Sequence, residues 1–196
     1  MRKGRLIEAF TIIMAAAFTN CDGEYEIIGK TESIPEGQTI FLQKQTDEQF
    51  EIVDSATINN GTFFFKGVQH SPAMAILVPS DNRQSQFPPL LLALEKGRIY
   101  VTLDSVSRIS GTPLNDRLQK YESQCRSYDT RIQAMTAQYL KKYLSGQLSD
   151  TAFYTWKRCF EKEQKGLETL TRDYILANTD NVTSVYLFLQ NSFLFS

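Results

Sequence analysis

The stretch SGTPLN at residues 110–115 divides the sequence into two parts with different hydrophobic periods. Before it, short apolar segments alternate with turn residues, as in β-strands joined by tight turns. After it, apolar residues recur every three or four positions, as in α-helices. Thr112 followed by Pro113 is typical of a helix start, with a hydroxyl at the N-cap and proline in the first turn. The sequence therefore predicts a β-rich domain over residues 21–111 and a helical hairpin or connector over residues 112–196.

The part before this boundary contains seven or eight expected strands. The sequence Asn59-Asn60-Gly61 supplies residues that tolerate positive φ, which a tight hairpin turn needs. Residues 95–97 are a second expected hairpin turn. The expected strands lie at residues 25–29, 39–44, 50–53, 55–58, 62–66, 74–78, 90–94 and 99–103. So many short strands in about ninety residues predict an antiparallel β-sandwich or open barrel.

The part after the boundary shows the heptad spacing of helices that pack lengthwise. Gly146 is expected to end a first long helix, and Ser149-Asp150 to cap a second, with Glu163 interrupting its apolar seam. The residues of the two seams are Leu114, Leu118, Tyr121, Cys125, Tyr128, Ile132, Met135, Tyr139, Phe153, Trp156, Phe160, Leu167, Leu170 and Tyr174. Two helices of about thirty residues in an antiparallel hairpin are expected, followed by a short C-terminal helix. The predicted fold class is α+β.

The first twenty residues have the features of a signal peptide. Arg2, Lys3 and Arg5 precede an apolar stretch at residues 9–18 that is too short to span a bilayer. Cys21 follows, and residues 18–21 resemble a bacterial lipobox, in which the cysteine carries diacylglycerol. Asn20 departs from the small residue usual before that cysteine. We expect a lipid anchor at Cys21, the alternative being a secreted protein in which Cys21 is unmodified.

Cys125 and Cys159 match no metal or redox spacing. In a helical hairpin they would lie about 15 Å apart along the axis, at roughly 1.5 Å per residue. A disulfide requires Cα atoms within about 7 Å of each other. We therefore expect two free and largely buried thiols.

Several segments resemble a domain of unknown function found in secreted lipoproteins of Gram-negative gut anaerobes. The matching segments are residues 25–29, 54–67, 94–101 and 110–115, and they are mostly turn and core positions. In that family the domain often precedes a thioredoxin-like disulfide-exchange domain with a Cys-x-x-Cys motif, which is absent here. The resemblance implies an accessory module, either a stand-alone relative or a truncated product whose apolar stretch at residues 182–195 would have packed on a following domain.

The sequence contains no pattern that predicts catalysis or a cofactor. The chain has 21 basic and 22 acidic residues, without the basic stripe that nucleic acid requires. His70, the only histidine, precedes Ser71-Pro72 and is expected in a loop rather than in a catalytic triad. No metal-ligand spacing or glycine-rich phosphate loop occurs. We expect a protein that is not an enzyme and that uses no cofactor or metal.

Two kinds of candidate site remain. Because side chains alternate across a strand, Phe64 is expected to point away from Phe63 and Phe65. With Tyr100 it could form a ligand face, although covering a second core or contacting the helical hairpin is the stronger expectation for Phe64. Ser55, Ser105 and Thr151 each follow an aspartate and precede a small apolar residue, which resembles the O-glycosylation acceptor of the same bacteria.

Three functions are compatible with these features. The first is a non-catalytic lipoprotein of the cell envelope, held at the outer membrane on its periplasmic or surface side, that acts as an interaction module. The second is a partner, or the truncated front half, of a thiol-disulfide oxidoreductase, which implies a thioredoxin-like protein as its partner. The third is a lipoprotein that binds a glycan or another small ligand on its β-rich domain.

Overall fold

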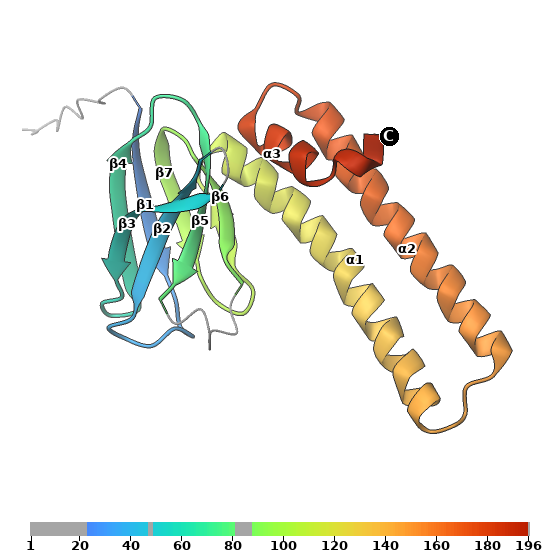
Figure 1. The fold of residues 1–196 in the computed structure, drawn as a ribbon. Helices are drawn as coiled ribbons and strands as arrows, with labels where there is room; N and C mark the ends of the chain where they lie inside the picture. Colours follow the sequence, from blue (N-terminus) through green and yellow to red (C-terminus); the bar gives the residue numbers. More distant parts are fainter. Residues whose placement is uncertain (1–22, 47–48, 81–87, 196) are drawn as a thin grey trace, which may run out of the picture.

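The computed structural model describes residues 23–46, 49–80 and 88–195. Within these residues, eight strands form two four-stranded sheets that pack as a sandwich, and three α-helices follow (Figure 1). A short 3-10 helix, η1 (Ser192–Phe195), comes last. The predicted α+β class, with a β-sandwich before a long helical pair and a short C-terminal helix, is confirmed.

The first sheet has the strand order β4-β1-β7-β8. Its bounds are β4 (Thr62–Val68), β1 (Glu24–Lys30), β7 (Gly97–Thr102) and β8 (Arg108–Ser110). Strands β1 and β7 pair in parallel, while β1–β4 and β7–β8 are antiparallel. The expectation of an antiparallel arrangement therefore fails for one pair, because the chain passes through the second sheet before it returns as β7.

The second sheet has the strand order β3-β2-β5-β6, and all of its pairs are antiparallel. Its bounds are β3 (Phe50–Thr57), β2 (Thr39–Gln45), β5 (Ala73–Pro79) and β6 (Leu90–Leu94). The two strands expected at residues 50–53 and 55–58 are one strand. Leu42 pairs with Asp54 and Gln43 with Ile52, so that Val53 is an extra residue in a β-bulge.

The two turns expected to form hairpins connect strands of different sheets. Asn60 and Gly61 have φ angles of 52° and 68°, as predicted for this turn. The turn nevertheless leads from β3 in one sheet to β4 in the other, and residues 95–97 likewise lead from β6 to β7. The predicted hairpin pairings are therefore wrong. Turn residues determine the local backbone, whereas the pairing of β4 with β1 is determined by the burial of alternate side chains such as Phe63 and Phe65.

The core lies between the two sheets and consists of their inward-facing side chains. The first sheet contributes Tyr25, Ile27, Phe63, Phe65, Ile99, Val101 and Ile109, and the second contributes Ile40, Leu42, Ala75, Leu77, Leu92 and Leu94. This cluster continues into the start of the helical part through Leu114 and Leu118. The sandwich and the first turns of the first helix therefore share one core.

The helical part begins at a tightly bonded junction. Helix α1 (Pro113–Leu144) starts after Thr112, as predicted, but the Thr112 side chain makes no capping bond to the helix. The Glu95 carboxylate instead accepts hydrogen bonds from the backbone N–H groups of Leu114 (2.7 Å) and Asn115 (3.3 Å). The buried Asn115 amide bonds both the N–H and the C=O of Ala93, at 2.9 and 2.8 Å. It thus satisfies the free backbone groups of β6, the edge strand.

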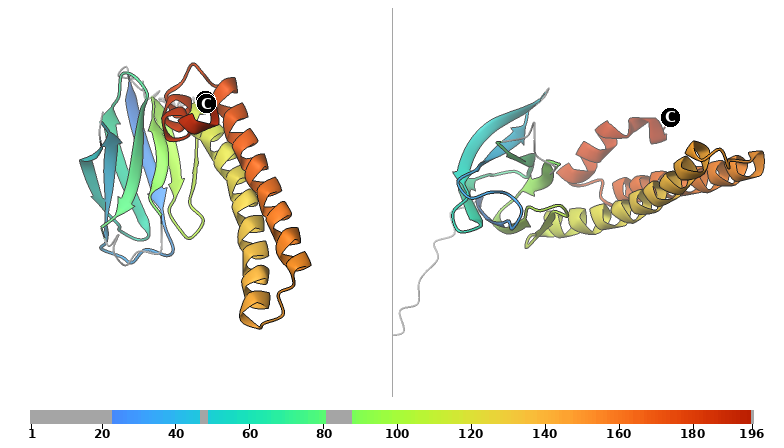
Figure 2. Two further views of the ribbon diagram at one scale, coloured as in Figure 1. Left: turned by 45° about the vertical axis from the view of Figure 1, so that its right-hand side comes forward. Right: turned by 90° about the horizontal axis from the view of Figure 1, so that it is seen from below.

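Helix α2 (Asp150–Ala177) runs back along α1, and the two helices extend away from the sandwich (Figures 1 and 2). Helix α3 (Val182–Gln190) lies at the sandwich end of the hairpin and contacts β5. The Ser184 hydroxyl donates to the carbonyl of Ile175 at 2.8 Å, which fixes α3 on the end of α2. The interruption of the seam by Glu163 is explained by its ion pair with Arg131, at 2.8 Å.

Candidate functional site

The outward side of the β4-β1-β7-β8 sheet carries a row of exposed apolar side chains, here called the aromatic row. The strand register places Phe64 of β4 beside Ile28 of β1, and Ile28 beside Tyr100 of β7. Their exposed fractions are 51%, 39% and 46%, respectively. The row crosses three neighbouring strands, so Phe64 and Tyr100 lie about 10 Å apart with Ile28 between them. Phe64 and Tyr100, named together from the sequence, therefore belong to one surface.

The expectation that Phe64 covers a second core or contacts the helical hairpin is wrong. The helices contact β8, β6 and β5, which leaves the outward side of β4 open. The alternation itself is confirmed, because Phe63 and Phe65 are buried while Phe64 is exposed. The outward side of this sheet is hereafter called the open face.

One flank of the aromatic row is a set of ion pairs. Lys66 of β4, Glu26 of β1 and Arg98 of β7 are neighbours in the register. The Arg98 Nε atom lies 3.0 Å from Glu26 Oε2, and Lys66 Nζ lies 2.7 Å from Glu24 Oε1. The hydrogen bond to Glu24 and the charge of this carboxylate raise the pKa of Lys66. The charges on this side of the row are thus largely balanced within the protein.

The other flank of the aromatic row is basic. Lys30, Thr62 and Thr102 are neighbours in the register, and Arg108 pairs with Thr102. No ion pair joins Lys30 or Arg108 to an acidic residue in the described part of the chain. These two cations, with the hydroxyl groups between them, are therefore available to a ligand.

A shallow cavity of about 540 Å³ lies at this basic flank. Its lining combines apolar, hydroxyl and basic groups: Ile28, Gly29, Lys30, Thr62, Tyr100, Val101, Thr102, Arg108 and Ser110. An aromatic ring beside hydroxyl groups and cations can stack on an apolar ring face of a ligand and bond its polar substituents. This combination suits a small polar ligand or a sugar with an acidic group.

Gly111 positions the Tyr100 ring at the edge of this cavity. Its φ of 103° lies in the left-handed region, and a Cβ atom there would come within 2.7 Å of the Tyr100 ring. The ring therefore lies against backbone that only glycine provides. Gly111 belongs to the segment that separates the β-rich and helical parts. The same residue therefore allows the chain to turn at this boundary and leaves room for the Tyr100 ring.

The open face also contains residues that no sequence pattern marks as a site, namely Ile28, Lys30 and Arg108. Strand alternation places Ile28 and Lys30 on the side opposite the buried Ile27. They lie close to Tyr100 because β1 pairs in parallel with β7, and no local sequence pattern predicts this pairing. Arg108 lies in the three-residue strand β8, which is too short to give a periodic signal.

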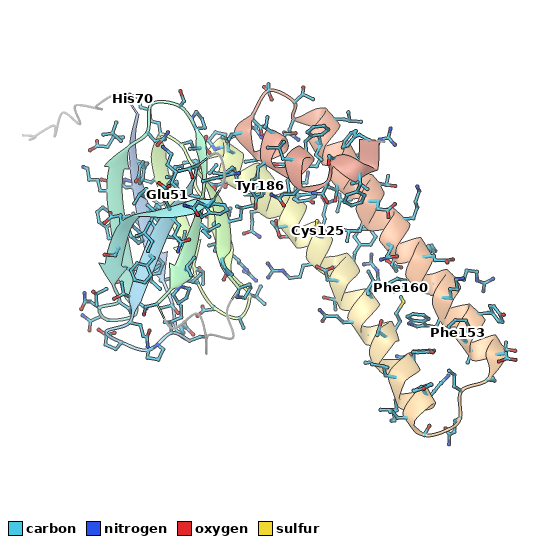
Figure 3. All side chains as sticks on the ribbon, viewed as in Figure 1. Glu51, His70, Cys125, Phe153, Phe160 and Tyr186 are labelled. Atoms are coloured by element: carbon cyan, nitrogen blue, oxygen red, sulfur yellow. The ribbon has the colours of Figure 1, made fainter. Side chains whose placement is uncertain are left out.

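The other predicted site residues are distributed over the molecule. Cys21 and the signal peptide lie outside the described residues. The three residues in glycosylation-like sequences are exposed: Ser55 in β3, Ser105 in the bend between β7 and β8, and Thr151 in the first turn of α2. His70 is exposed in a bend after β4 (Figure 3).

Cys125 and Cys159 are free, as predicted, but the expectation that both are largely buried is wrong. Cys125 is half-buried and Cys159 is exposed. Burial raises the pKa of the Cys125 thiol to about 11, so the thiolate is scarce at neutral pH. Within the described residues, no group of three or more His, Cys, Asp or Glu side chains could hold a metal ion. No helix in that part of the chain is long and apolar enough to cross a bilayer.

Comparison with known families gives one match, and it lies over the β-rich part. Residues 25–118 match the model of a family described as a domain of unknown function (DUF4369). The match ends at Leu118, a fully buried residue by which α1 packs into the sandwich core. It therefore covers the sandwich and the junction with α1, while the rest of the helical part lies beyond it. No curated protein matches the chain.

Proposed function

We propose that this protein is a non-catalytic lipoprotein of the bacterial cell envelope, and that it acts as an interaction module through the open face of its sandwich. The observation that carries the proposal is the aromatic row, Phe64, Ile28 and Tyr100, exposed between a balanced set of ion pairs and a basic flank that has no acidic partner among the described residues. Contiguous apolar side chains framed by polar ones mark binding surfaces on soluble domains.

The open face is better suited to binding a glycan or another small polar ligand than to catalysing a reaction. The face is an open sheet surface, whereas catalysis of hydrolysis or group transfer depends on preorganised groups in a site that excludes water. The side chains along the cavity are aromatic, aliphatic, hydroxyl and basic. They can bind and orient a ligand, and they offer no nucleophile with an adjacent base.

The proposed anchor holds the module close to a membrane. Cys21 precedes β1, which begins at Glu24, by three residues. A diacylglycerol group on Cys21 would therefore keep the sandwich at the membrane surface, on the periplasmic or outer side of the outer membrane. Mass spectrometry of the N-terminal peptide from the cell envelope tests this. The proposal requires a lipid-modified Cys21, and an unmodified Cys21 in a soluble fraction would contradict it.

Ligand binding is tested with a glycan array and a thermal-shift screen of the chain that begins at Asp22. We expect at least one acidic glycan or small anion to bind and to raise the melting temperature. Phe64→Ala with Tyr100→Ala should abolish that shift. The matched control is Ile52→Ala with Val53→Ala, two exposed residues on the other sheet. If both screens remain blank, or if the two double variants behave alike, the open face is not the binding site.

A second candidate function is that of partner to a thioredoxin-like protein. The observation that favours it is a group of exposed apolar side chains on α3 and η1: Val185, Phe188, Leu189 and Phe193. Crosslinking in cells followed by mass spectrometry of the captured proteins tests this function. Capture of a thioredoxin-like protein that is lost in Phe188→Ser would support it, and its absence from the captured proteins would count against it.

A further inference from the structure

The end of the helical hairpin farthest from the sandwich, residues 140–158, is here called the tip. It contains the last turn of α1, the connection and the first two turns of α2. Both helices carry it away from the sandwich, and α3 lies over the half of the hairpin that is nearer to the sandwich (Figures 1 and 2). In Figure 3 the label Phe153 marks the tip, and Phe160 lies just beyond it on α2. The tip is thus available to a partner that the sandwich does not touch.

The tip exposes large apolar side chains. Leu144 is 82% exposed and Tyr143 61% exposed, and Leu140, Phe153 and Tyr154 are also exposed. These residues come from the ends of two helices and surround one connection. Single exposed apolar residues are common on protein surfaces, but a group of five at the end of a projecting element indicates a contact surface.

Beneath these residues lies an aromatic stack. The ring of Trp156 is stacked on Tyr139, with centroids 4.6 Å apart, and on Phe160, at 5.2 Å. These rings hold α1 and α2 together beside a cavity of about 420 Å³ between the helices. Trp156 Nε1 is buried there without a hydrogen-bond partner among the described residues. The stack gives the exposed side chains a firm base close to the end of the hairpin.

The tip is also basic in an acidic protein. It contains Lys141, Lys142, Lys157 and Arg158 and one acidic residue, Asp150, which gives a charge of +3. Lys157 pairs at 3.9 Å with Glu161, just outside the tip, at an exposed position where solvent screens the pair. Without residues 1–20, which hold three basic residues and one acidic, the chain has 18 basic and 21 acidic residues and a charge of −3. The rest of that chain therefore carries −6. Positive charge and exposed apolar side chains coincide in this one segment.

We propose that the tip docks on the surface of an anionic lipid bilayer. Exposed tyrosine and leucine side chains favour the boundary between lipid headgroups and acyl chains. Lysine and arginine beside them extend their charged ends to anionic headgroups while their aliphatic stems remain in the boundary. A second copy of this chain fits less well, since two tips would bring together charges of +3.

This docking is independent of the proposed anchor at Cys21 and of the open face. Strand β1, which follows Cys21 in the sequence, is part of the sandwich, whereas the tip lies at the far end of the hairpin (Figure 2). A chain without residues 1–21 therefore retains the tip and all of the described strands and helices. Its binding to lipid vesicles reports on the tip without a contribution from an acyl group or from the apolar leader.

The experiment uses vesicles of phosphatidylglycerol and phosphatidylcholine in equal amounts, with vesicles of phosphatidylcholine alone for comparison. The chain that begins at Asp22 is assayed by co-sedimentation. Trp156, the only tryptophan, is an internal reporter of contact with the bilayer. We expect binding to the anionic vesicles that weakens with added salt, and quenching of Trp156 fluorescence by brominated lipid.

Two variants of the tip test the two components of the surface. Lys141→Glu with Lys142→Glu should weaken binding by at least about 10-fold, because each basic residue near an anionic surface contributes appreciably. Leu144→Ser removes an apolar side chain that is almost fully exposed, so it should weaken binding without altering the fold. The matched controls are Lys120→Glu with Lys165→Glu, and Leu176→Ser, all at exposed positions nearer to the sandwich.

Three results would overturn the proposal. The first is an absence of binding to anionic vesicles, and the second is equal binding of tip variants and controls. The third is a concentration-dependent dimer that the tip variants disrupt, seen by analytical ultracentrifugation, which would assign the tip to a second copy. A loss of vesicle binding in the tip variants, with ligand shifts on the open face unchanged, would support it.

Discussion

The sandwich and the distal half of the helical hairpin are built from similar proportions of apolar residues but bury them to different extents. Between the sheets, side chains such as Ile27, Ile40 and Leu92 are completely buried. In α1 the buried residues are confined to the first turns and end at Tyr121, although the helix continues to Leu144. The seam residues beyond Tyr121 are only half-buried.

The difference follows from geometry. Two sheets that face each other enclose the inward side chains of eight strands, and water reaches only the outward sides. Two helices alone touch along one line, so most of the circumference of each helix remains in water. The sandwich therefore has a core that is enclosed on all sides and shared with the first turns of α1, whereas the distal hairpin has one stack of rings and the attachment at its base. We expect the hairpin to open locally at a free-energy cost well below that of global unfolding.

The largest expected effect is in the sandwich core. Phe65 is 1% exposed and contacts Phe63 edge to face, with ring centroids 6.1 Å apart. Phe65→Ala should lower the free energy of unfolding by about 3–5 kcal/mol, because it removes a large buried side chain and leaves a cavity. Urea denaturation followed by circular dichroism measures this loss. The comparison with the hairpin would fail if Trp156→Ala cost as much in the same assay.

A smaller effect is expected at the junction between the two regions. Asn115→Ala removes the amide that bonds the N–H and C=O of Ala93, and leaves both groups buried and unpaired. The free energy of unfolding should fall by about 2–3 kcal/mol. Gln124→Ala, at an exposed position of the same helix, is the control. A loss below about 0.5 kcal/mol for Asn115→Ala would show that the helix and the sandwich are joined by apolar contacts alone.

A third prediction concerns a loop at one end of the sandwich and depends on pH. Burial of Asp104 tends to raise its pKa, but hydrogen bonds from Glu32, Ser33 and Thr31 outweigh burial and hold the pKa below the ordinary value of 3.8. The backbone N–H of Glu32 donates at 2.9 Å and that of Ser33 at 3.1 Å. Ionised Asp104 therefore stabilises the fold above its unfolded pKa, and this contribution is lost as the pH falls through its folded pKa.

Asp104→Asn should accordingly lower the free energy of unfolding by about 0.5–1 kcal/mol at pH 7, since solvent screens this carboxylate, and by less as the pH falls below 4. Denaturation curves at several pH values between 7 and 3 measure the difference from the parent chain. Asp173→Asn, an exposed aspartate on α2, serves as the control. A difference for Asp104→Asn that does not change with pH would mean that its hydrogen bonds do not depend on its charge.

The sequence is sufficient to predict most of the secondary structure, including the start of α1 after Thr112. Local signals were strong where one residue type has one physical role, as at Pro113, Gly146 and Ser149. The pairing of strands could not be predicted, since Asn60 and Gly61 determine a turn and not the sheet that the next strand joins. The composition of the open face depends on that pairing, so only Phe64 and Tyr100 were found in advance.

The exposure of Cys159 was missed for a related reason. Heptad spacing indicates which side of a helix is apolar, but it does not indicate how many layers cover that side. In a two-helix hairpin, residues beside the seam remain accessible, and Cys159 lies beside Trp156 at the inter-helix cavity. The same reasoning applies to Phe64. Its apolar side chain suggests packing against the helices, but the helices do not cover it and it remains exposed.

The smallest expected effect concerns the ion pair between the two helices of the hairpin, and it tests whether the hairpin unfolds separately from the sandwich. Arg131 and Glu163 join α1 to α2 through an ion pair at 2.8 Å, in the place where the apolar seam is interrupted. Arg131 is half-exposed, so solvent screens the pair, and a double-mutant cycle with Arg131→Gln and Glu163→Gln should give a coupling of about 0.5 kcal/mol. Because we expect the hairpin to open locally, the cycle is best measured by hydrogen exchange of α2 amides near Glu163, with β1 amides as the internal control. A coupling confined to α2 would show that the hairpin opens independently of the sandwich. Equal changes in α2 and β1 would show instead that both regions unfold as one cooperative unit.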